Sequence, residues 1–545
     1  MKKIIFYKVS FIILLMLSFG CSEDYLQEEP PHIMAGESLY NSYNGFESGL
    51  NGLYALMRIG RANDDHLQLV LSGVDNMCTN YDTEKFFSDW GELNSPTEGD
   101  FEDIFAWCYE IINAANTIIN RAENENIDWT GGTSSPDGNK NRVLAEARAL
   151  RAWAYRFLTY CWGDVPLNLE ESLGSSINTD WQRTPVEKVR QQIISDLLFA
   201  QQHISADGSY QGRITKGAVQ HYLAEMYLVK NMPDSAEYWA DQVIDNPEYE
   251  LVTERYGVLE SEPGVVFMDM FQEGNQNRLE GNTEALWVIQ FEANVIGGGE
   301  SKIRRYHGCR YDLINIDGVT PLEITFDRGG RNKSYFAPTK FAIDLYEDQD
   351  ERGSNFAIRK FFILKDEVEN APLRGDDLPP GYSYGDTIWN DWSEDLTADH
   401  NKVANWPWSR KADGTDPNDV RSDYNFNDQV YLRLADTYLL KAEAQLKQGF
   451  PEQAATTINI VRERSNATPV TDVDLDFILD ERSRELFLEE ERRFTLLRTH
   501  KWLERVAAYN KYGGEKIAPR DTLFPIPQVV IDANLTTPME QNPGW

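Results

Sequence analysis

The sequence predicts a mainly α-helical protein in which tetratricopeptide-repeat-like helical hairpins form a scaffold and an irregular, loop-rich subdomain contains short strands. Two observations favour this fold class. Apolar residues recur at helical spacing in the first and last parts of the chain. Between about residues 255 and 425 this periodicity weakens, and Gly, Asp, Asn and Pro become more frequent. With 545 residues, 41% of them hydrophobic, the chain can bury a large core.

The beginning of the chain has the features of a secretory signal. Three lysines flank an apolar core of about a dozen residues, which is shorter than the roughly twenty that cross a bilayer as a helix. Gly20 before Cys21 favours signal peptidase II cleavage and attachment of lipid to the Cys21 sulfur. The alternative is ordinary cleavage that leaves a plain cysteine. We therefore expect residues 1–20 to be a signal peptide and residues 21–35 to be a lipidated tether.

The N-terminal region, residues 36–254, is expected to begin with long helices. Residues 36–59 and 101–123 carry apolar side chains at helical spacing. Residues 141–160 are rich in alanine, the residue with the highest helix propensity. Small alanine side chains also let a neighbouring helix approach closely, so we expect this helix to pack tightly against another.

Two later segments, residues 221–244 and 431–461, each predict two amphipathic helices joined by a short turn. Each contains two alanines twelve positions apart, a spacing similar to that of the small-residue positions in a tetratricopeptide repeat. These alanines are Ala224 and Ala236 in the first hairpin, and Ala442 and Ala454 in the second. One hairpin cannot bury its apolar face alone, so we expect the hairpins to stack. Residues 478–498 and 501–509 are expected to pair and to close the C-terminal region, residues 426–545.

Residues 255–425 are predicted to form an irregular ligand-binding subdomain. The run from Ala285 to Phe291 alternates as a strand does, with Trp287 expected in the core. The last third of this region is mostly turn-forming and carries four tryptophans, and residues 60–100 are a second irregular, aromatic stretch. Loops on a rigid scaffold are where binding residues usually lie. These stretches are therefore the candidate ligand-binding regions.

Aromatic side chains in these stretches are the candidate ligand contacts. A flat ring can stack on the apolar face of a sugar while polar side chains bind its hydroxyl groups. The alternative for every tryptophan is a place in the core, where large aromatic side chains are mostly found. The predicted glycan contacts are Trp90 first, with Asp75 and Asn80 as polar neighbours, then Tyr306, Arg310 and Tyr311 in one loop, then Trp389 and Trp392, and finally Trp406 and Trp408.

Composition and motifs argue against nucleic-acid binding and against catalysis. The formal net charge of −36 repels a phosphate backbone. The sequence contains no P-loop, no G-x-S-x-G nucleophile motif and no H-E-x-x-H zinc motif. Aspartates from Asp472 to Asp476 begin like a calcium loop but lack its later ligands, so we expect them to cap a helix that starts near Asp476. We expect no catalytic residue, no metal and no cofactor.

Two further expectations concern cysteines and arginines. Cys108 and Cys161 lie in apolar surroundings and are expected to be buried, whereas the sequence leaves open whether Cys78 and Cys309 pair. Four arginines near the C-terminus interleave with glutamates, which predicts ion pairs between residues three or four apart on a helix rather than a desolvated catalytic carboxylate pair. These arginines are Arg482, Arg484, Arg492 and Arg493.

Several short motifs follow one another in a distinctive order along the chain. They are AEARALRAW at 145–153, WGDVPL at 162–167, RITKGA at 213–218, PTK at 338–340, DER at 350–352, INIVRER at 458–464, ERSREL at 481–486, ERRF at 491–494, FPIP at 524–527 and QNPGW at 541–545. Together they resemble the SusD/RagB family of surface nutrient-binding lipoproteins, over nearly the full length of the chain.

The resemblance implies a helical fold with four repeat hairpins and a more irregular subdomain that holds the ligand site. It implies a lipid anchor at the outer face of the outer membrane and a SusC-like TonB-dependent transporter as partner. It further implies that a glycan is captured and delivered to that transporter without catalysis, and that Trp90 and the 304–312 loop lie in binding regions. Peptide capture of the RagB type is the alternative, and a glycoside hydrolase, which needs two carboxylates about 5–10 Å apart, is a distant one.

Overall fold

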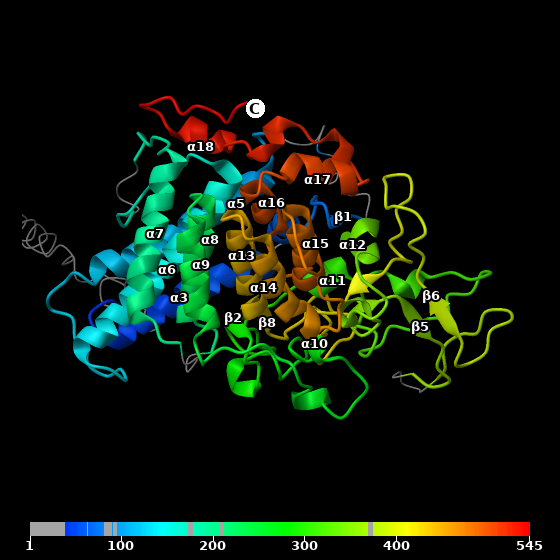
Figure 1. Ribbon diagram of the computed structural model, residues 1–545. Helices are drawn as coiled ribbons and strands as arrows, with labels where there is room; N and C mark the ends of the chain where they lie inside the picture. Colours follow the sequence, from blue (N-terminus) through cyan, green and yellow to red (C-terminus); the bar gives the residue numbers. More distant parts are fainter. Residues whose placement is uncertain are drawn as a thin grey trace, which may run out of the picture.

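A computed structural model describes residues 39–62, 64–80, 90, 95–172, 178–206, 211–368 and 374–545. The predicted signal peptide and tether, including Cys21, lie outside these residues. In the described part of the chain, helices dominate both ends of the sequence, and short strands and loops occupy the segment between them (Figure 1). None of the helices in this part combines the length and the apolar character needed to cross a membrane.

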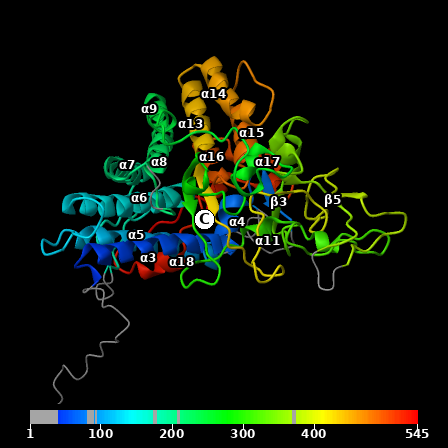
Figure 2. The ribbon, with the colours of Figure 1, turned by 90° about the horizontal axis from the view of Figure 1, so that it is seen from below.

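Long helices of the N-terminal region pack side by side at one end of the molecule (Figures 1 and 2). They are α3 (Tyr43–Ala62), α5 (Gly99–Arg121), α6 (Pro136–Trp162) and α7 (Val186–His203). The short helix α4 (Asp64–Leu71) lies nearer the middle of the molecule (Figure 2). These bounds confirm the three helices expected from periodicity and alanine content, although α3 begins at Tyr43 rather than at 36 and α6 begins at Pro136 rather than at 141.

Helix α6 is the centre of this N-terminal layer. Its first turn is favourable, because the Ser135 hydroxyl accepts a hydrogen bond from the Gly138 N–H and Pro136 needs no N–H partner. Residues 145–162 are nearly all buried, since α5 packs on one side of the helix and α7 on another. The helix ends at Gly163, whose φ of 71° is left-handed and suits glycine.

Two helical hairpins form the middle of the molecule, as the alanine spacing predicts. The first comprises α8 (Lys216–Val229) and α9 (Pro233–Ile244), and the second comprises α13 (Leu434–Lys447) and α14 (Pro451–Arg464). All four spaced alanines are at most 1% exposed. The two hairpins meet through α9 and α13, where a cluster of small and aliphatic side chains closes the interface. The predicted stacking is therefore confirmed.

The C-terminal helices depart from the predicted third hairpin. They are α15 (Leu475–Leu486), α16 (Arg492–Arg498), α17 (Trp502–Tyr509) and α18 (Gln528–Ala533). The expected continuous helix over 478–498 is interrupted at residues 487–491, where Leu488 has a φ of 71°. The acidic run before α15 acts as expected, because the Asp474 carboxylate accepts a hydrogen bond from the Phe477 N–H.

The segment between α9 and α13 is called here the irregular segment. It carries all the described short strands except β1, which lies between α4 and α5 in the sequence. The strands pair two by two, and all four pairs are antiparallel. The pairs are β1 (Met77–Thr79) with β3 (Phe336–Pro338), β2 (Ala285–Ile289) with β8 (Gln429–Arg433), β4 (Ile358–Arg359) with β7 (Trp408–Ser409), and β5 (Phe361–Ile363) with β6 (Thr387–Trp389). Short helices α10 (Val266–Asp269), α11 (Ile303–His307) and α12 (Lys340–Asp344) lie among them. The strand predicted from Ala285 onward is confirmed, with Trp287 buried.

The four cysteines of the described chain are buried free thiols. Cys108 and Cys161 are therefore buried as expected. Cys78 and Cys309 do not pair. Burial raises the pKa of the Cys78 thiol, and likewise that of Cys309, so both are inert packing groups rather than nucleophiles.

A buried network of guanidinium and carboxylate groups joins the irregular segment to helices α14 and α15. The Glu485 carboxylate receives Arg352 at 2.9 Å and Arg433 at 2.6 Å, and it also pairs with Arg464. The side chains of this group are at most 1% exposed. Burial alone would raise the pKa of Glu485, but the surrounding guanidinium groups hold it well below its ordinary value. The network therefore keeps its charges by pairing them away from water.

Most of the ion pairs expected along single helices are instead made between elements. Arg484 follows the prediction, since it pairs with Glu481 three residues earlier at 2.8 Å. The other three do not pair at this spacing: Arg482 pairs with Glu490 and Asp436, Arg492 pairs with Asp75 and with Glu490 two residues before it, and Arg493 donates to the backbone carbonyls of Asp521 and Thr522. The prediction was wrong because sequence spacing does not show which carboxylates the fold brings to a buried guanidinium.

The Glu485→Gln variant tests how much this network contributes to the free energy of unfolding. Loss of one carboxylate leaves buried guanidinium groups uncompensated, which typically costs about 3–5 kcal/mol. We expect a loss of this size in the free energy of unfolding, measured by urea denaturation. The matched control is Glu187→Gln, because Glu187 is 60% exposed and its pair with Arg190 should change the free energy by less than about 1 kcal/mol. Equal losses in the two variants would contradict the structural role of Glu485.

Candidate functional site

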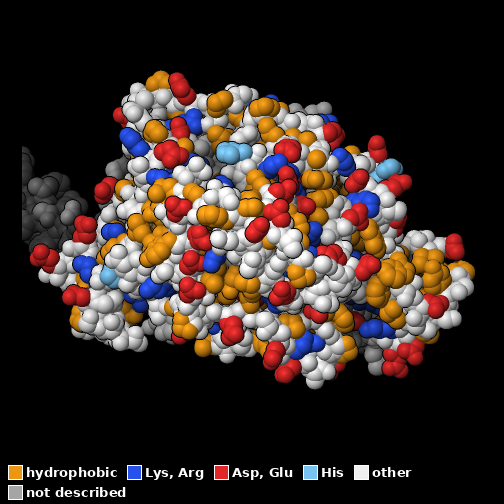
Figure 3. Space-filling view, viewed as in Figure 1, with side chains coloured by type: hydrophobic (Ala, Val, Ile, Leu, Met, Phe, Trp, Pro, Cys, Tyr) orange, Lys and Arg blue, Asp and Glu red, His pale blue; other side chains and the backbone are white. Residues whose placement is uncertain are grey.

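The β5–β6 hairpin presents an aromatic surface to solvent. Its register places Phe361 opposite Trp389, with ring centroids 4.8 Å apart. Trp389 is 58% exposed, and Ile363, on the same face of β5, is 40% exposed. Alternation sends Phe362 and Ile388 to the other face, where they are buried. Figure 3 shows hydrophobic side chains gathered over this end of the molecule, where Figure 1 places β5 and β6.

Polar groups lie next to this aromatic surface. Trp392 is half-buried, and the Lys360 ammonium lies 5.9 Å from its ring centroid. The Asp391 carboxylate pairs with Lys402 at 2.8 Å, and this hydrogen bond lowers the pKa of Asp391. Trp392 thus lies beside a cation, and a carboxylate lies between Trp389 and Trp392 in the sequence. Rings with polar groups close by are what stacking on a sugar and binding its hydroxyl groups requires.

Trp90 does not lie on an exposed surface as predicted. Its side chain is 1% exposed, and its indole N–H donates to the Gly73 carbonyl at 3.1 Å. The ring meets Trp502 edge-on at 5.3 Å, and the Arg493 guanidinium lies 5.7 Å from its centroid. Acidic and amide neighbours in the sequence suggested exposure, but the fold packs the ring against the C-terminal helices.

The polar neighbours predicted for Trp90 are also buried. Asp75 accepts hydrogen bonds from Arg492 and Arg505, each at 2.8 Å, so its carboxylate is part of the ionic core. Asn80 donates to the Ser334 hydroxyl at 2.7 Å and accepts from the Lys402 N–H at 2.9 Å. Both side chains fix backbone and helices in place, which corrects the expectation that they face a ligand.

The predicted 304–312 loop folds mostly inward. Tyr311 is 1% exposed and its hydroxyl donates to the Gly330 carbonyl at 2.9 Å. Arg310 is half-buried and pairs with Asp312 at 2.9 Å. Tyr306 is 2% exposed and stacks on Tyr335, with centroids 4.7 Å apart and planes 11° from parallel. The fourth predicted group is core as well, since Trp406 and Trp408 are 0% and 2% exposed.

Around Tyr306 the structure reveals a group of residues that the sequence did not indicate. The Lys333 ammonium lies 4.5 Å from the Tyr335 centroid and 5.8 Å from the Tyr306 centroid. The Lys302 ammonium lies 5.9 Å from the Tyr306 centroid and 5.5 Å from that of Tyr424. We call these five residues the tyrosine–lysine cluster. The cluster brings together residues of α11, of the loop just before β3 and of the loop before β8. These segments are far apart in the sequence, so no local pattern could have revealed it.

Another hollow lies between α3 and the loop 292–300, with a volume of about 560 Å³. Ile59, Val295 and Ile296 supply its apolar wall. Arg58 lines it too, but this guanidinium donates to the carbonyl oxygens of Gln290 and Gly297 and so holds the loop in place. Phe426 also lines this hollow, with Glu292, Asn294 and Glu300, so an aromatic ring and polar groups occur here too.

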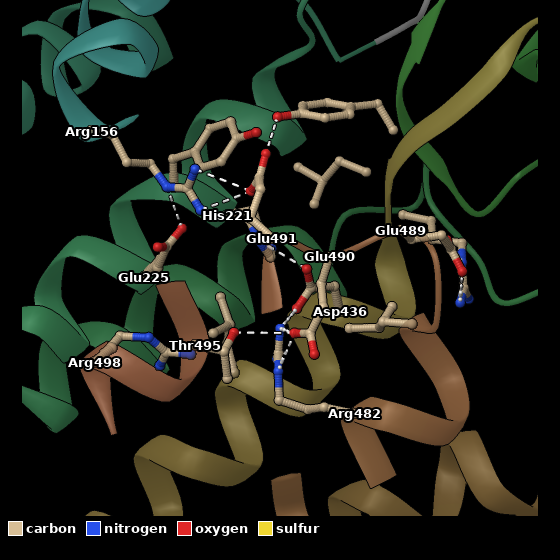
Figure 4. Close-up of a pocket in the computed structure, with 16 residues that line it drawn as sticks. Arg156, His221, Glu225, Asp436, Arg482, Glu489, Glu490, Glu491, Thr495 and Arg498 are labelled. Atoms are coloured by element: carbon tan, nitrogen blue, oxygen red, sulfur yellow. Dashed lines mark hydrogen bonds and ion pairs between the residues drawn. The ribbon is translucent and has the colours of Figure 1, made fainter. Parts of the chain in front are cut away.

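A small internal cavity of about 30 Å³ is surrounded by charge (Figure 4). Arg156 donates to Glu225 at 2.8 Å and to Glu491 at 3.3 Å, and Arg482 donates to Glu490 at 2.7 Å. Burial raises the pKa of Glu225, yet the Arg156 charge brings it below its ordinary value. A volume near that of one water excludes a substrate. Carboxylates held ionised by guanidinium groups are also unsuited to act as general acids.

Among the described residues, no group of three or more His, Cys, Asp or Glu side chains is placed to hold a metal ion. The exposed aromatic surface, the tyrosine–lysine cluster and the hollow beside α3 are the arrangements of rings and polar groups described above that a ligand can contact.

Comparison with known proteins identifies the family of this fold. The SusD family model matches residues 263–545, more than half of the chain. The chain belongs to the SusD family. A second family model, described as starch-binding and associating with the outer membrane, matches residues 24–228. The resemblance found in the sequence motifs is thus confirmed.

Individual proteins are similar along most of their length. The SusD-like protein P25 of Formosa agariphila is 24% identical over 520 residues, which cover 90% of this chain and 89% of the relative. The starch-binding protein SusD of Bacteroides thetaiotaomicron is 26% identical over 462 residues, which cover 77% and 75%.

Solved structures show the same fold. A SusD homologue from Bacteroides thetaiotaomicron matches with a TM-score of 0.69 at 20% identity, covering 93% of this chain and 97% of that one. A laminarin-binding SusD-like protein matches with a TM-score of 0.65 at 21% identity, covering 92% and 99%. The mainly helical fold class with tetratricopeptide-like hairpins is therefore confirmed.

The burial of Trp90 predicts a stability effect rather than a binding effect. Replacing a buried tryptophan by alanine typically costs about 3–5 kcal/mol. We expect Trp90→Ala to lower the free energy of unfolding by this amount, measured by urea denaturation. Trp389→Ala, which removes an exposed ring, is the control and should change it by less than about 0.5 kcal/mol. Unchanged stability of Trp90→Ala, together with lost glycan binding, would return Trp90 to the ligand site.

Proposed function

We propose that the protein is a non-catalytic, cell-surface lipoprotein that captures an oligosaccharide or polysaccharide and passes it to a SusC-like TonB-dependent transporter. The observation that carries this proposal is the exposed Trp389–Phe361 surface on the β5–β6 hairpin. Adjacent aromatic rings that are open to solvent form a surface that a ligand can cover. A sugar ring covers such a surface with its C–H face while its hydroxyl groups stay accessible to polar side chains.

The geometry around Trp389 supports a glycan in particular. The two rings lie side by side on one strand pair, and the backbone pairing of β5 with β6 fixes their spacing without any ligand. The Asp391 carboxylate, held by Lys402, lies two residues further along the chain and can accept hydrogen bonds from sugar hydroxyl groups. A pre-formed surface of this kind loses little conformational entropy on binding.

Family membership supports the same proposal. Relatives of this chain bear names that state binding of starch or of laminarin, and the model matched by the N-terminal half is described as associating with the outer membrane. The buried, fully paired carboxylates of Figure 4 favour binding without catalysis.

Trp389→Ala is expected to weaken binding of the captured glycan by about 1–3 kcal/mol, because the variant loses its stacking surface while the fold is kept. Binding is screened by retardation in affinity gels that contain different polysaccharides, and it is then measured by calorimetry on residues 22–545. The matched control is Tyr238→Ala, which removes an aromatic ring that is 55% exposed on α9. Equal affinity of Trp389→Ala, Tyr238→Ala and wild type would remove Trp389 from the site.

The same screen includes basic and neutral oligopeptides. Peptide capture is the alternative function, and the net charge of −36 would favour basic peptides. Heat released by peptides, with no retardation by any polysaccharide, would replace the glycan proposal by peptide capture.

The lipid anchor is tested at Cys21. A sulfur that carries acyl chains holds the protein to the membrane, so Cys21→Ser should move the protein from the membrane fraction to the soluble fraction. Cys78→Ala, which removes a buried free thiol, should stay with the membrane. Wild-type protein that is solubilised from the membrane with detergent should copurify with a SusC-like transporter. Membrane association of Cys21→Ser equal to that of wild type would contradict the anchor, and recovery of the wild type alone would contradict the partnership.

A further inference from the structure

We propose that the tyrosine–lysine cluster, with the neighbouring Arg331 and Arg305, binds anionic groups of a glycan, so that the captured polysaccharide carries sulfate esters or carboxylates. This inference rests on the proposed glycan-binding function and specifies its substrate class. Sulfate and carboxylate offer the same recognition chemistry, namely negatively charged oxygens that accept hydrogen bonds from lysine and arginine.

Positively charged side chains gather around the tyrosine–lysine cluster. The chain as a whole carries a net charge of −36, yet Lys302, Arg304, Arg305, Arg331 and Lys333 fall within 32 consecutive residues and meet in space. The Lys333 N–H donates to the Arg305 carbonyl at 2.6 Å, and the Arg304 guanidinium donates to the Arg331 carbonyl. Cations gathered in one place offer several charged donors to the same anion.

Lys333 and the arginines near this cluster have few carboxylate partners among the described residues. Arg305 pairs with Asp423 at 2.7 Å, and that carboxylate is itself 48% exposed. Neither Arg331 nor Lys333 forms an ion pair with any carboxylate in the described part of the chain. Arg305 is 3% exposed, and its Nε has no hydrogen-bond acceptor there. Arg331 and Lys333 therefore add positive charge that no carboxylate of the described residues pairs with.

The guanidinium groups of Arg304, Arg305 and Arg331 repel one another. Burial lowers the pKa of Arg304 to about 10, and the adjacent Arg305 charge adds to this effect. Burial also lowers the pKa of Arg305, and Arg331 opposes its charge too. An anion placed among these groups would relieve the repulsion and stabilise all of the charged forms.

The aromatic rings complete a surface suited to a charged sugar. Tyr306 and Tyr335 are stacked, and Tyr335, Tyr424, Lys302 and Lys333 are all partly exposed. Lysines beside half-exposed rings can bind a charged substituent while a ring edge contacts the sugar. The cluster thus differs from the β5–β6 surface, which has exposed rings with one lysine and a paired carboxylate close by.

The test compares polysaccharides that differ in charge alone. Amylopectin, laminarin and xylan are each used beside derivatives that have been sulfated or carboxymethylated in vitro, in affinity gels and by calorimetry at 150 mM NaCl. We expect the wild type to bind the anionic form of one backbone about tenfold more tightly than its neutral parent. We expect this preference to fall as the salt concentration rises.

The decisive variant is Arg331→Gln/Lys333→Gln. It should lose most of the roughly tenfold preference for the anionic form, while its affinity for the neutral parent stays unchanged. The matched control is Lys188→Gln/Lys230→Gln, which removes the same charge from α7 and the end of α8 and should keep the preference. Trp389→Ala should weaken binding of both forms equally. Thermal unfolding followed by circular dichroism verifies that each variant is folded.

Each result is decisive. Equal binding of neutral and anionic forms by the wild type would overturn the anion inference and leave the proposed glycan function standing. Loss of the preference to the same extent in the control variant would also overturn it, since the effect would then be one of net charge. Retardation by none of the polysaccharides would contradict both this inference and the proposed function.

Discussion

The buried guanidinium–carboxylate network around Glu481 and Glu485 is the interaction on which the rest of the structure depends. Both carboxylates project from α15, and their partners come from three other places: Arg352 in the irregular segment, Arg433 at the end of β8, and Arg462 and Arg464 in α14. Charges this deeply buried are tolerated when every one is paired. The network therefore fixes the position of the irregular segment against the repeat hairpins.

A segment fixed in this way can carry loops with little regular structure and still present a rigid surface. The β5–β6 hairpin shows how. Its inner face packs Phe362 against Tyr311 and Trp408, so the outer face holds Trp389 and Phe361 in fixed positions. Figures 1 and 2 show this hairpin at the opposite end of the molecule from α7, away from the helical layers. The helical part thus supplies stability, and the irregular segment supplies contacts.

The sequence was informative about the fold because helices and repeats leave local patterns. Alanines at positions such as Ala224 and Ala442 marked the hairpin interfaces, and Asp474 marked a helix start. The candidate site depends on burial, which local composition does not determine. Trp90 and Trp389 both lie among acidic residues, yet one is core and the other is exposed. The tyrosine–lysine cluster escaped prediction because its members come from three separate segments.

Stacking of a glycan on the β5–β6 surface is the central part of the proposed function. The most direct measurement is a crystal structure of residues 22–545 with an oligosaccharide from the polysaccharide that retards the protein in affinity gels. The account predicts a sugar ring over the Trp389 indole, with polar contacts from neighbouring side chains. A well-ordered sugar bound elsewhere, with Trp389 still open to solvent, would contradict it.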